Sequence, residues 1–219
     1  MEIKTNDIRD LEKKYTQVLK EVFDSKGFKR NLFKVKDYID HQYKDLGRAW
    51  AQKNKVKIAV ERLIRFHLYT DLDVKNIYPS VLSPDLAVEL KDVILCVDAK
   101  TIDMIGNAGD DDSIHFQKNQ ITFNNIPLYG KNFGEYEWPG VYFNPQLSKY
   151  HNGKPCITFF VTVNYRDNNR SFQLSHGSIC CIPHAQIVQE EWNGDIISNY
   201  KSFGYLTTTE ANQLNKSSL

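Results

Sequence analysis

The sequence predicts an α/β domain, with a central mixed β-sheet flanked by helices and a helical N-terminal third. Two observations carry this prediction. Apolar residues in the first 70 positions recur at three- and four-residue spacings, as on one face of a helix. After Thr70, Pro79 and Pro84 interrupt that spacing, and the apolar runs shorten to the length of strands. The 219 residues, 41% of them hydrophobic, fit one domain with a substantial core.

Three segments of the first third have helical patterns: residues 6–23, 35–46 and 57–69. The first places Ile8, Leu11 and Tyr15 on one apolar stripe, and a polar stretch with Gly27 is expected to end it. The third segment repeats the pattern. It also places Glu61 and Arg65 one helical turn apart, where they can pair.

The later segments have strand patterns. Residues 86–88 and 93–99 are expected to be two strands joined by a charged turn, and the second is a nearly continuous apolar run, typical of a strand buried on both faces. Residues 156–165 alternate apolar and polar side chains, and residues 171–182 form a further expected strand. We expect a loop over residues 105–113 and irregular structure over the aromatic-rich residues 123–150.

One domain is expected, residues 1–219, without internal repeats. Residues 1–70 form its mostly helical part, residues 71–206 its sheet-rich part, and residues 207–219 a loosely ordered tail. The formal net charge is only +1. Residues 1–70 carry 17 Lys/Arg and 10 Asp/Glu, whereas residues 71–219 carry 11 and 17. The basic half can therefore contact phosphates while the acidic half holds cations, although a solvated helical face explains any single lysine equally well.

Several classes of protein are not expected. No stretch approaches the roughly 18 apolar residues of a membrane span, and the N-terminus lacks the apolar centre of a signal peptide. We therefore expect a cytoplasmic protein without a membrane partner. Cys96, Cys156, Cys180 and Cys181 show no CxxC spacing and are expected to be buried thiols.

Asp98 and Lys100 stand at the end of the apolar segment 93–99, two residues apart. Because side chains alternate between the faces of a strand, these two leave the same face. Asp85 lies 13 residues before Asp98, across the charged turn, so an antiparallel neighbouring strand can bring its carboxylate back beside Asp98. We therefore expect two carboxylates and one ammonium group to meet at a sheet edge.

Such a cluster suits the hydrolysis of phosphodiester bonds. Two carboxylates suit Mg²⁺, a hard cation that prefers oxygen ligands, and the backbone carbonyl of Ala99 offers a further oxygen. The cation polarises a scissile phosphate and lowers the pKa of a water molecule. Lys100 is expected to orient or deprotonate that water and to offset developing negative charge.

The pair Pro84-Asp85 followed by Asp98-Ala99-Lys100 resembles the signature of the PD-(D/E)xK nuclease superfamily. Chain length and layout resemble its type II restriction endonucleases, and the motif covers about 17 of the 219 residues. The resemblance implies a restriction-endonuclease-like fold, Asp85 and Asp98 as Mg²⁺ ligands, and Lys100 as the catalytic lysine. Some members add an acidic residue on a preceding helix. Glu61 is the candidate here, although pairing with Arg65 explains it equally well.

The motif is short, and the chain contains six acid-x-Lys triplets. Only Asp98-Ala99-Lys100 both ends an apolar strand and has a Pro-Asp pair at hairpin distance upstream. The alternative interpretation is a Lys-Asp ion pair at the end of a strand.

A polar segment after this strand is the first candidate for contacts to DNA bases and phosphates. It comprises Gln117, Lys118, Asn119 and Gln120, and an exposed polar loop is the alternative interpretation. Four further residues belong to the same hypothesis with less weight: Asn124, Asn125, Lys131 and Asn132. Asp110, Asp111 and Asp112 fit a solvated loop better than a cation site. His176, Cys180, Cys181 and His184 have residue types that suit zinc, but adjacent cysteines would face opposite sides of a strand.

The function expected is that of a type II restriction endonuclease, a Mg²⁺-dependent hydrolase that cuts double-stranded DNA at a short specific sequence as part of a restriction system. A homodimer is expected, because two active sites related by a two-fold axis match a palindromic duplex. Two alternatives remain open: a structure-directed DNA repair or recombination nuclease of the same superfamily, and a non-catalytic DNA-binding module.

Overall fold

The computed structural model describes residues 3–46, 53–78, 85–104, 126–128, 141–143, 150–167, 172–184, 186–187 and 202–216. Three long helices come first in the chain and a short helix comes last. Their bounds are α1 (Thr5–Asp24), α2 (Lys26–Leu46), α3 (Lys53–Asp71) and α5 (Thr208–Lys216).

Between the helices the chain forms a seven-stranded mixed sheet with the order β1-β2-β3-β7-β8-β9, and with β6 paired to β7. All pairings are antiparallel except that of β3 with β7, which is parallel and forms the centre of the sheet. The strands are β1 (Asn76–Tyr78), β2 (Leu86–Glu89), β3 (Ile94–Asp103), β6 (Tyr150–His151), β7 (Lys154–Asp167), β8 (Phe172–Ile182) and β9 (Phe203–Leu206). β4 (Ile126–Leu128) and β5 (Val141–Phe143) form a separate antiparallel pair.

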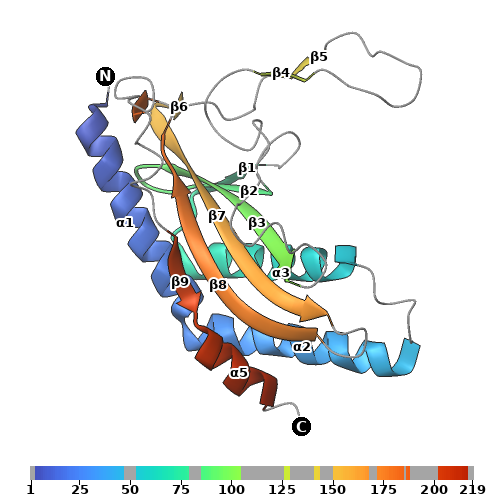
Figure 1. Cartoon of the computed structure of the whole chain (residues 1–219). Coiled ribbons are helices and arrows are strands. Elements are labelled where there is room, and N and C mark those ends of the chain that lie inside the picture. The colour runs from blue at the N-terminus through green and yellow to red at the C-terminus, as the bar shows by residue number, and fades with distance from the viewer. Residues whose placement is uncertain are drawn as a thin grey trace.

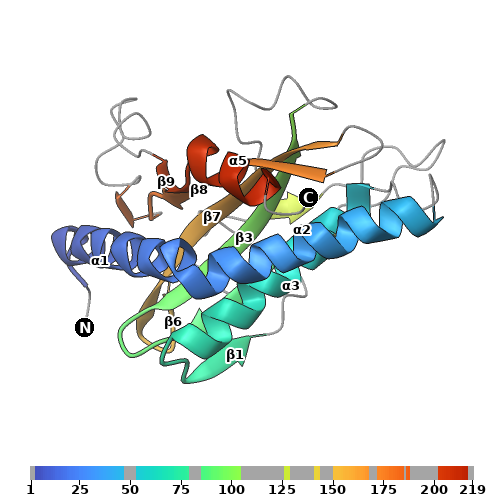
Figure 2. The same cartoon turned by 90° about the horizontal axis from the view of Figure 1, so that it is seen from below.

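The two faces of the central strands differ in chemistry. Figures 1 and 2 show α1, α2 and α3 packed along one face of the sheet. Apolar side chains of β3 and β7, such as Val97, Phe159 and Val161, point toward this helical layer and share one buried cluster with it. The alternate residues of the same strands, including Asp98 and Phe160, point to the opposite face. The helices thus cover one face, and the side chains of Asp98 and Lys100 lie on the other.

This architecture confirms the predicted α/β class, with helices first and a mixed sheet afterwards. Each expected strand over residues 86–88, 93–99, 156–165 and 171–182 overlaps an observed one. No described helix is long and apolar enough to cross a membrane. Cys96, Cys156 and Cys181 are buried free thiols, and Cys180 is half-buried.

The first helix ends in the expected polar stretch, but Gly27 is not the residue that ends it, and the second helix begins earlier than the expected residue 35. The α1 helix ends at Asp24, and α2 begins at Lys26, so that Gly27 lies inside a helix. The cause is Ser25, which has an extended backbone and whose hydroxyl oxygen accepts a hydrogen bond of 3.1 Å from the backbone amide of Phe28. A serine in this position caps the start of a new helix.

The expected loosely ordered tail is also wrong in its larger part, because α5 occupies residues 208–216 and contacts β8. Thr207 and Glu210 cap this helix reciprocally. The Glu210 carboxylate accepts a 2.8 Å hydrogen bond from the Thr207 amide, and the Thr207 hydroxyl accepts one of 3.2 Å from the Glu210 amide. Within the aromatic-rich segment, where irregular structure was expected, β4 and β5 pair as strands.

Candidate active site

The hairpin of β2 and β3 brings Asp85 back to Asp98, as the sequence spacing predicted. Leu86 pairs with Val97, so the antiparallel register places Asp85, just before β2, at the level of Asp98. The contact itself is between Asp85 and the next residue of β3. The backbone amide of Ala99 donates a 2.8 Å hydrogen bond to Oδ2 of Asp85. The main chain of one strand therefore fixes the carboxylate carried by the other.

Asp98 and Lys100 leave the same face of β3, and Nζ of Lys100 lies 2.5 Å from Oδ2 of Asp98. The two side chains differ in exposure: Asp98 is 1% exposed, whereas Lys100 is 25% exposed. Nζ of Lys100 also lies 5.6 Å from the centre of the Phe160 ring, on the neighbouring strand β7. The ammonium group is thus held beside the buried carboxylate while part of its side chain remains accessible to solvent.

Burial and the negative charge of Asp85 together raise the pKa of Asp98 to about 6. Lys100 opposes this increase. The two carboxylates therefore lie close enough for their negative charges to repel each other. A group in this condition is stabilised by a proton or by a cation, and perturbed carboxyl groups of this kind are typical of functional sites.

The backbone of Ala99 contributes to the same space. Its amide points toward Asp85, beyond the point at which β2 enters the sheet. Because the N–H and C=O groups of a strand residue point to the same side, the carbonyl oxygen of Ala99 also points toward this edge. The pairing of β2 with β3 begins with Leu86 opposite Val97, so Ala99 lies beyond the ladder of hydrogen bonds between these two strands.

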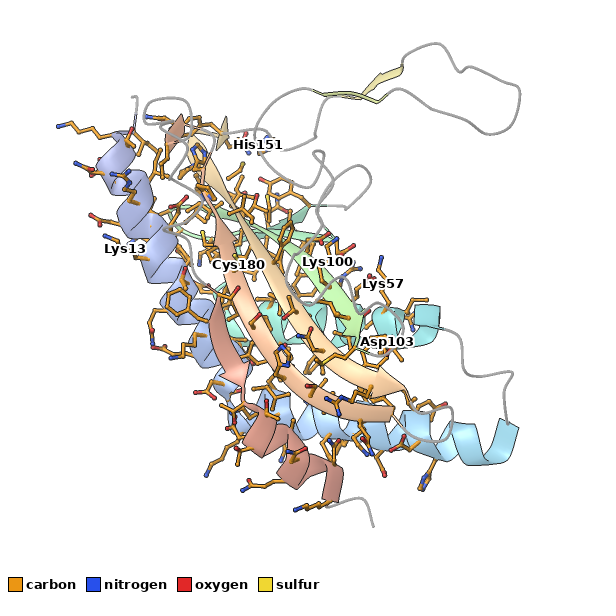
Figure 3. All side chains as sticks on the ribbon, viewed as in Figure 1. Lys13, Lys57, Lys100, Asp103, His151 and Cys180 are labelled. Atoms are coloured by element: carbon orange, nitrogen blue, oxygen red, sulfur yellow. The ribbon has the colours of Figure 1, made fainter. Side chains whose placement is uncertain are left out.

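Glu61 approaches the cluster from α3. Burial raises the pKa of Glu61, and so does the charge of Asp85, which places the two carboxylates within electrostatic reach of each other. The expected pairing of Glu61 with Arg65 is not the one observed. Nζ of Lys57, one turn earlier, lies 3.5 Å from Oε1 of Glu61, and Arg65 instead reaches the backbone of Asp85. Figure 3 shows Lys57 on α3 and Lys100 on β3 toward the same side of the molecule.

The residues present fit a hard divalent cation through their chemistry. All the candidate donors are oxygens, and buried Oε1 of Glu61 forms only the long, 3.5 Å ion pair with Lys57 among the described residues. Within the described ranges, no three Asp, Glu, His or Cys side chains lie close enough together to form a ready-made metal site. The candidate donors are Asp85, Asp98 and the Ala99 carbonyl, with Glu61 as a more distant candidate.

The remaining candidates of the sequence lie elsewhere. Gln117 to Gln120, Asp110 to Asp112 and the four further residues Asn124, Asn125, Lys131 and Asn132 fall outside the described residues. Cys180 and Cys181 face opposite sides of β8, as expected for adjacent strand residues. The ring of His176 is hydrogen bonded to Asn164.

Sequence reasoning missed Arg65 as part of this site. Its Nη2 donates a 2.7 Å hydrogen bond to the backbone carbonyl of Asp85, 20 residues away. The helical spacing of Glu61 and Arg65 indicated that both lie on one face of α3. It did not show that this face meets the start of β2.

Two solved structures are similar to this chain in fold. One is the tetrameric restriction endonuclease SfiI bound to cognate DNA, with 14% identity, a TM-score of 0.49, and coverage of 89% of this chain and 71% of that one. The other is the restriction endonuclease BglI bound to its DNA recognition sequence, with 11% identity, a TM-score of 0.49, and coverage of 88% and 82%. No protein-family model and no curated protein matches the sequence.

Proposed function

We propose that the protein is a type II restriction endonuclease, which hydrolyses phosphodiester bonds in both strands of a DNA duplex at a short specific sequence and requires Mg²⁺. The observation that carries the proposal is the arrangement of Asp85, Asp98 and Lys100. The Ala99 amide holds the first carboxylate beside the second, and Lys100 lies 2.5 Å from the second. The resemblance of these residues to the PD-(D/E)xK signature supports the same activity.

Each residue has a distinct role in this proposal. Asp85, Asp98 and the Ala99 carbonyl would hold Mg²⁺, which when bound supplies positive charge to the scissile phosphate and acidity to a water molecule. The buried Asp98 carboxylate keeps Nζ of Lys100 in place. Lys100 orients the attacking water and, as an ammonium group, offsets the negative charge that develops on the phosphate.

Glu61 is proposed as an additional acidic group of the same centre. The charge of Asp85 raises the pKa of Glu61, and among the described residues Oε1 of Glu61 forms only a long, 3.5 Å ion pair with Nζ of Lys57. The repulsion between the Glu61 and Asp85 carboxylates is relieved by a cation that both can bind. A hydrated cation fits this requirement.

The proposed partner is double-stranded DNA, and the proposed assembly is a homodimer. One chain carries one cluster of Asp85, Asp98 and Lys100, whereas cutting both strands of a palindromic duplex requires two centres related by a two-fold axis. A second copy of the chain supplies the second centre.

The test is incubation of the purified protein with a long unmethylated duplex, with and without Mg²⁺, followed by sequencing of all new ends. An Asp98→Ala variant is the matched control. Discrete Mg²⁺-dependent fragments that share one short sequence, absent with the variant, are the expected result. Nicks directed by DNA structure rather than sequence would favour a repair or recombination nuclease. Binding that is unchanged by Mg²⁺, without any cleavage, would instead identify a DNA-binding module.

A further inference from the structure

Two arginines on α3 have different environments. Arg62 is exposed, whereas Arg65 is half-buried and directs its guanidinium group to the start of β2. There Nη2 of Arg65 donates a 2.7 Å hydrogen bond to the backbone carbonyl of Asp85. Arg65 also lowers the pKa of Glu61, one turn earlier, through its charge. This arginine thus touches the backbone of one candidate metal ligand and lies near a second acidic group.

Asp85 needs such a contact because the sheet does not hold its main chain. The pairing of β2 with β3 begins at Leu86, one residue later, so Asp85 stands just outside the ladder. Its side chain is fixed by the Ala99 amide, through the 2.8 Å bond to Oδ2. Its backbone is fixed by Arg65. Together the two contacts define the orientation of the carboxylate relative to Asp98.

The burial of Arg65 is difficult to explain by stability alone. Its Nε atom is buried without a hydrogen-bond acceptor among the described residues. A buried guanidinium donor without an acceptor is destabilising, and an apolar side chain of similar length would fill the space at a smaller desolvation cost. The hydrogen bond that Nη2 donates to the Asp85 carbonyl gives an arginine at this position a role that an apolar side chain cannot fill.

We propose that Arg65 is a positioning residue for the catalytic centre. By fixing the Asp85 backbone, Arg65 sets the direction of the Asp85 carboxylate and thereby the affinity of the centre for Mg²⁺. The effect on Mg²⁺ affinity rests on the proposed nuclease function, whereas the positioning of Asp85 does not. Residues that orient metal ligands affect metal affinity or activity by about 10- to 100-fold when they are replaced.

The first experiment measures the positioning directly, in the full chain without metal or DNA. Hydrogen exchange of the Ala99 amide reports the bond to Asp85, because that amide is released when the carboxylate moves. We expect Arg65→Met to accelerate exchange of this amide by at least about 10-fold. Amides of β3 that bond to β7 and the melting temperature are expected to stay unchanged. Arg62→Met, on the exposed face of the same helix, is the matched control and is expected to change nothing.

The second experiment measures the Mg²⁺ concentration that gives half-maximal cleavage. Arg65→Met is expected to raise it by about 10- to 100-fold relative to Arg62→Met. Arg65→Lys retains a donor and is expected to restore part of the loss. If Arg65→Met does not fold, Arg65→Leu, which likewise removes the donor, takes its place.

Each result decides between named alternatives. Unchanged exchange of the Ala99 amide in the folded variant that lacks the donor, Arg65→Met or Arg65→Leu, would overturn the positioning role. An unchanged Mg²⁺ requirement in an active protein would overturn its link to the metal. Absence of cleavage by the unmodified protein would contradict the proposed nuclease function, whereas the exchange measurement would still decide whether Arg65 positions Asp85.

Discussion

Asp98 and Asp85 lie close enough together that the charge of one opposes ionisation of the other. Burial and the Asp85 carboxylate raise the pKa of Asp98 from its ordinary 3.8 to about 6. The arrangement therefore costs folding free energy at neutral pH, when both groups are charged. A centre of this kind is less stable than its neutral counterpart until a cation occupies it.

The first prediction follows for Asp98→Asn. The folded protein binds the Asp98 proton more tightly than the unfolded chain, so stability from this group is fully present below pH 3.8 and is lost as the pH rises through 6. The amide variant has no such loss. At about pH 7.5 we expect its free energy of unfolding to exceed that of the unmodified protein by about 1–3 kcal/mol, and near pH 4 we expect no difference. Urea unfolding at the two pH values measures this, and equal values at pH 7.5 would contradict the account.

The second prediction concerns Lys100. Lys100→Met keeps the length of the side chain and removes the ammonium group that lies 2.5 Å from Asp98. We expect the rate of DNA cleavage under single-turnover conditions to fall by about 10²- to 10⁴-fold, the usual contribution of a positioned acid-base group. Lys91→Met, in the exposed turn between β2 and β3, is the control and is expected to cleave normally. Equal rates for the two variants would exclude Lys100 from the chemistry.

The third prediction concerns Glu61. Glu61→Gln preserves the shape of the side chain and removes its charge beside Asp85. We expect the Mg²⁺ concentration for half-maximal cleavage to rise by about 10-fold, as for other groups that surround metal ligands. The exposed Glu21 of α1 provides the comparison, through Glu21→Gln. If Glu61 serves only as the ion-pair partner of Lys57, then Lys57→Met and Glu61→Gln will lower stability alike and leave the Mg²⁺ requirement unchanged.

The fourth prediction concerns the approach of Gly177 on β8 to Tyr205 on β9. A Cβ atom at position 177 would lie 2.6 Å from the Tyr205 hydroxyl oxygen and 2.7 Å from Cε2 of the ring. Because that ring is buried, Gly177→Ala is expected to lower the free energy of unfolding by about 1–3 kcal/mol. At Gly204 the nearest atom to an added Cβ would be 3.9 Å away. Gly204→Ala is therefore the control, and a loss of the same size in both variants would argue against this packing.

The fifth prediction concerns the hydroxyl group of Tyr205, which donates a 2.6 Å hydrogen bond to the backbone carbonyl of Thr162 on β7. Tyr205→Phe retains the ring and leaves this buried carbonyl with one partner fewer. We expect a loss of about 1–2 kcal/mol in the free energy of unfolding, measured by urea. Tyr38 is 59% exposed, so Tyr38→Phe should have no measurable effect. An unchanged free energy of unfolding for Tyr205→Phe would show that this hydrogen bond contributes little to stability.

Local patterns were sufficient to predict the main strands and the hairpin of the site. The alternation over residues 156–165 identified β7, because the apolar set faces the helices and the polar set faces away. The distance of 13 residues between Asp85 and Asp98, across a charged turn, predicted that the two carboxylates meet. Both inferences depend only on the two-residue period of a strand and on antiparallel pairing.

Features that depend on tertiary contacts were not predictable in the same way. The spacing of Glu61 and Arg65 indicated an ion pair, but the fold places Arg65 against the Asp85 carbonyl and leaves Lys57 as the partner of Glu61. The short strand β1 has exposed residues at two of its three positions and therefore no apolar pattern. By contrast, the helix α5 had a signal that was overlooked, since Thr207 and Glu210 have the spacing of a capping box.

Asp85, Asp98 and Lys100 are proposed to form one catalytic centre for DNA cleavage. The most direct test is the single-turnover cleavage rate of a long unmethylated duplex with Mg²⁺, for the unmodified protein and for Asp85→Asn, Asp98→Asn and Lys100→Met. We expect Mg²⁺-dependent cleavage by the unmodified protein and a loss of at least about 10²-fold in each variant, with all four proteins folded. Cleavage that persists in the variants, or no cleavage by the unmodified protein, would contradict it.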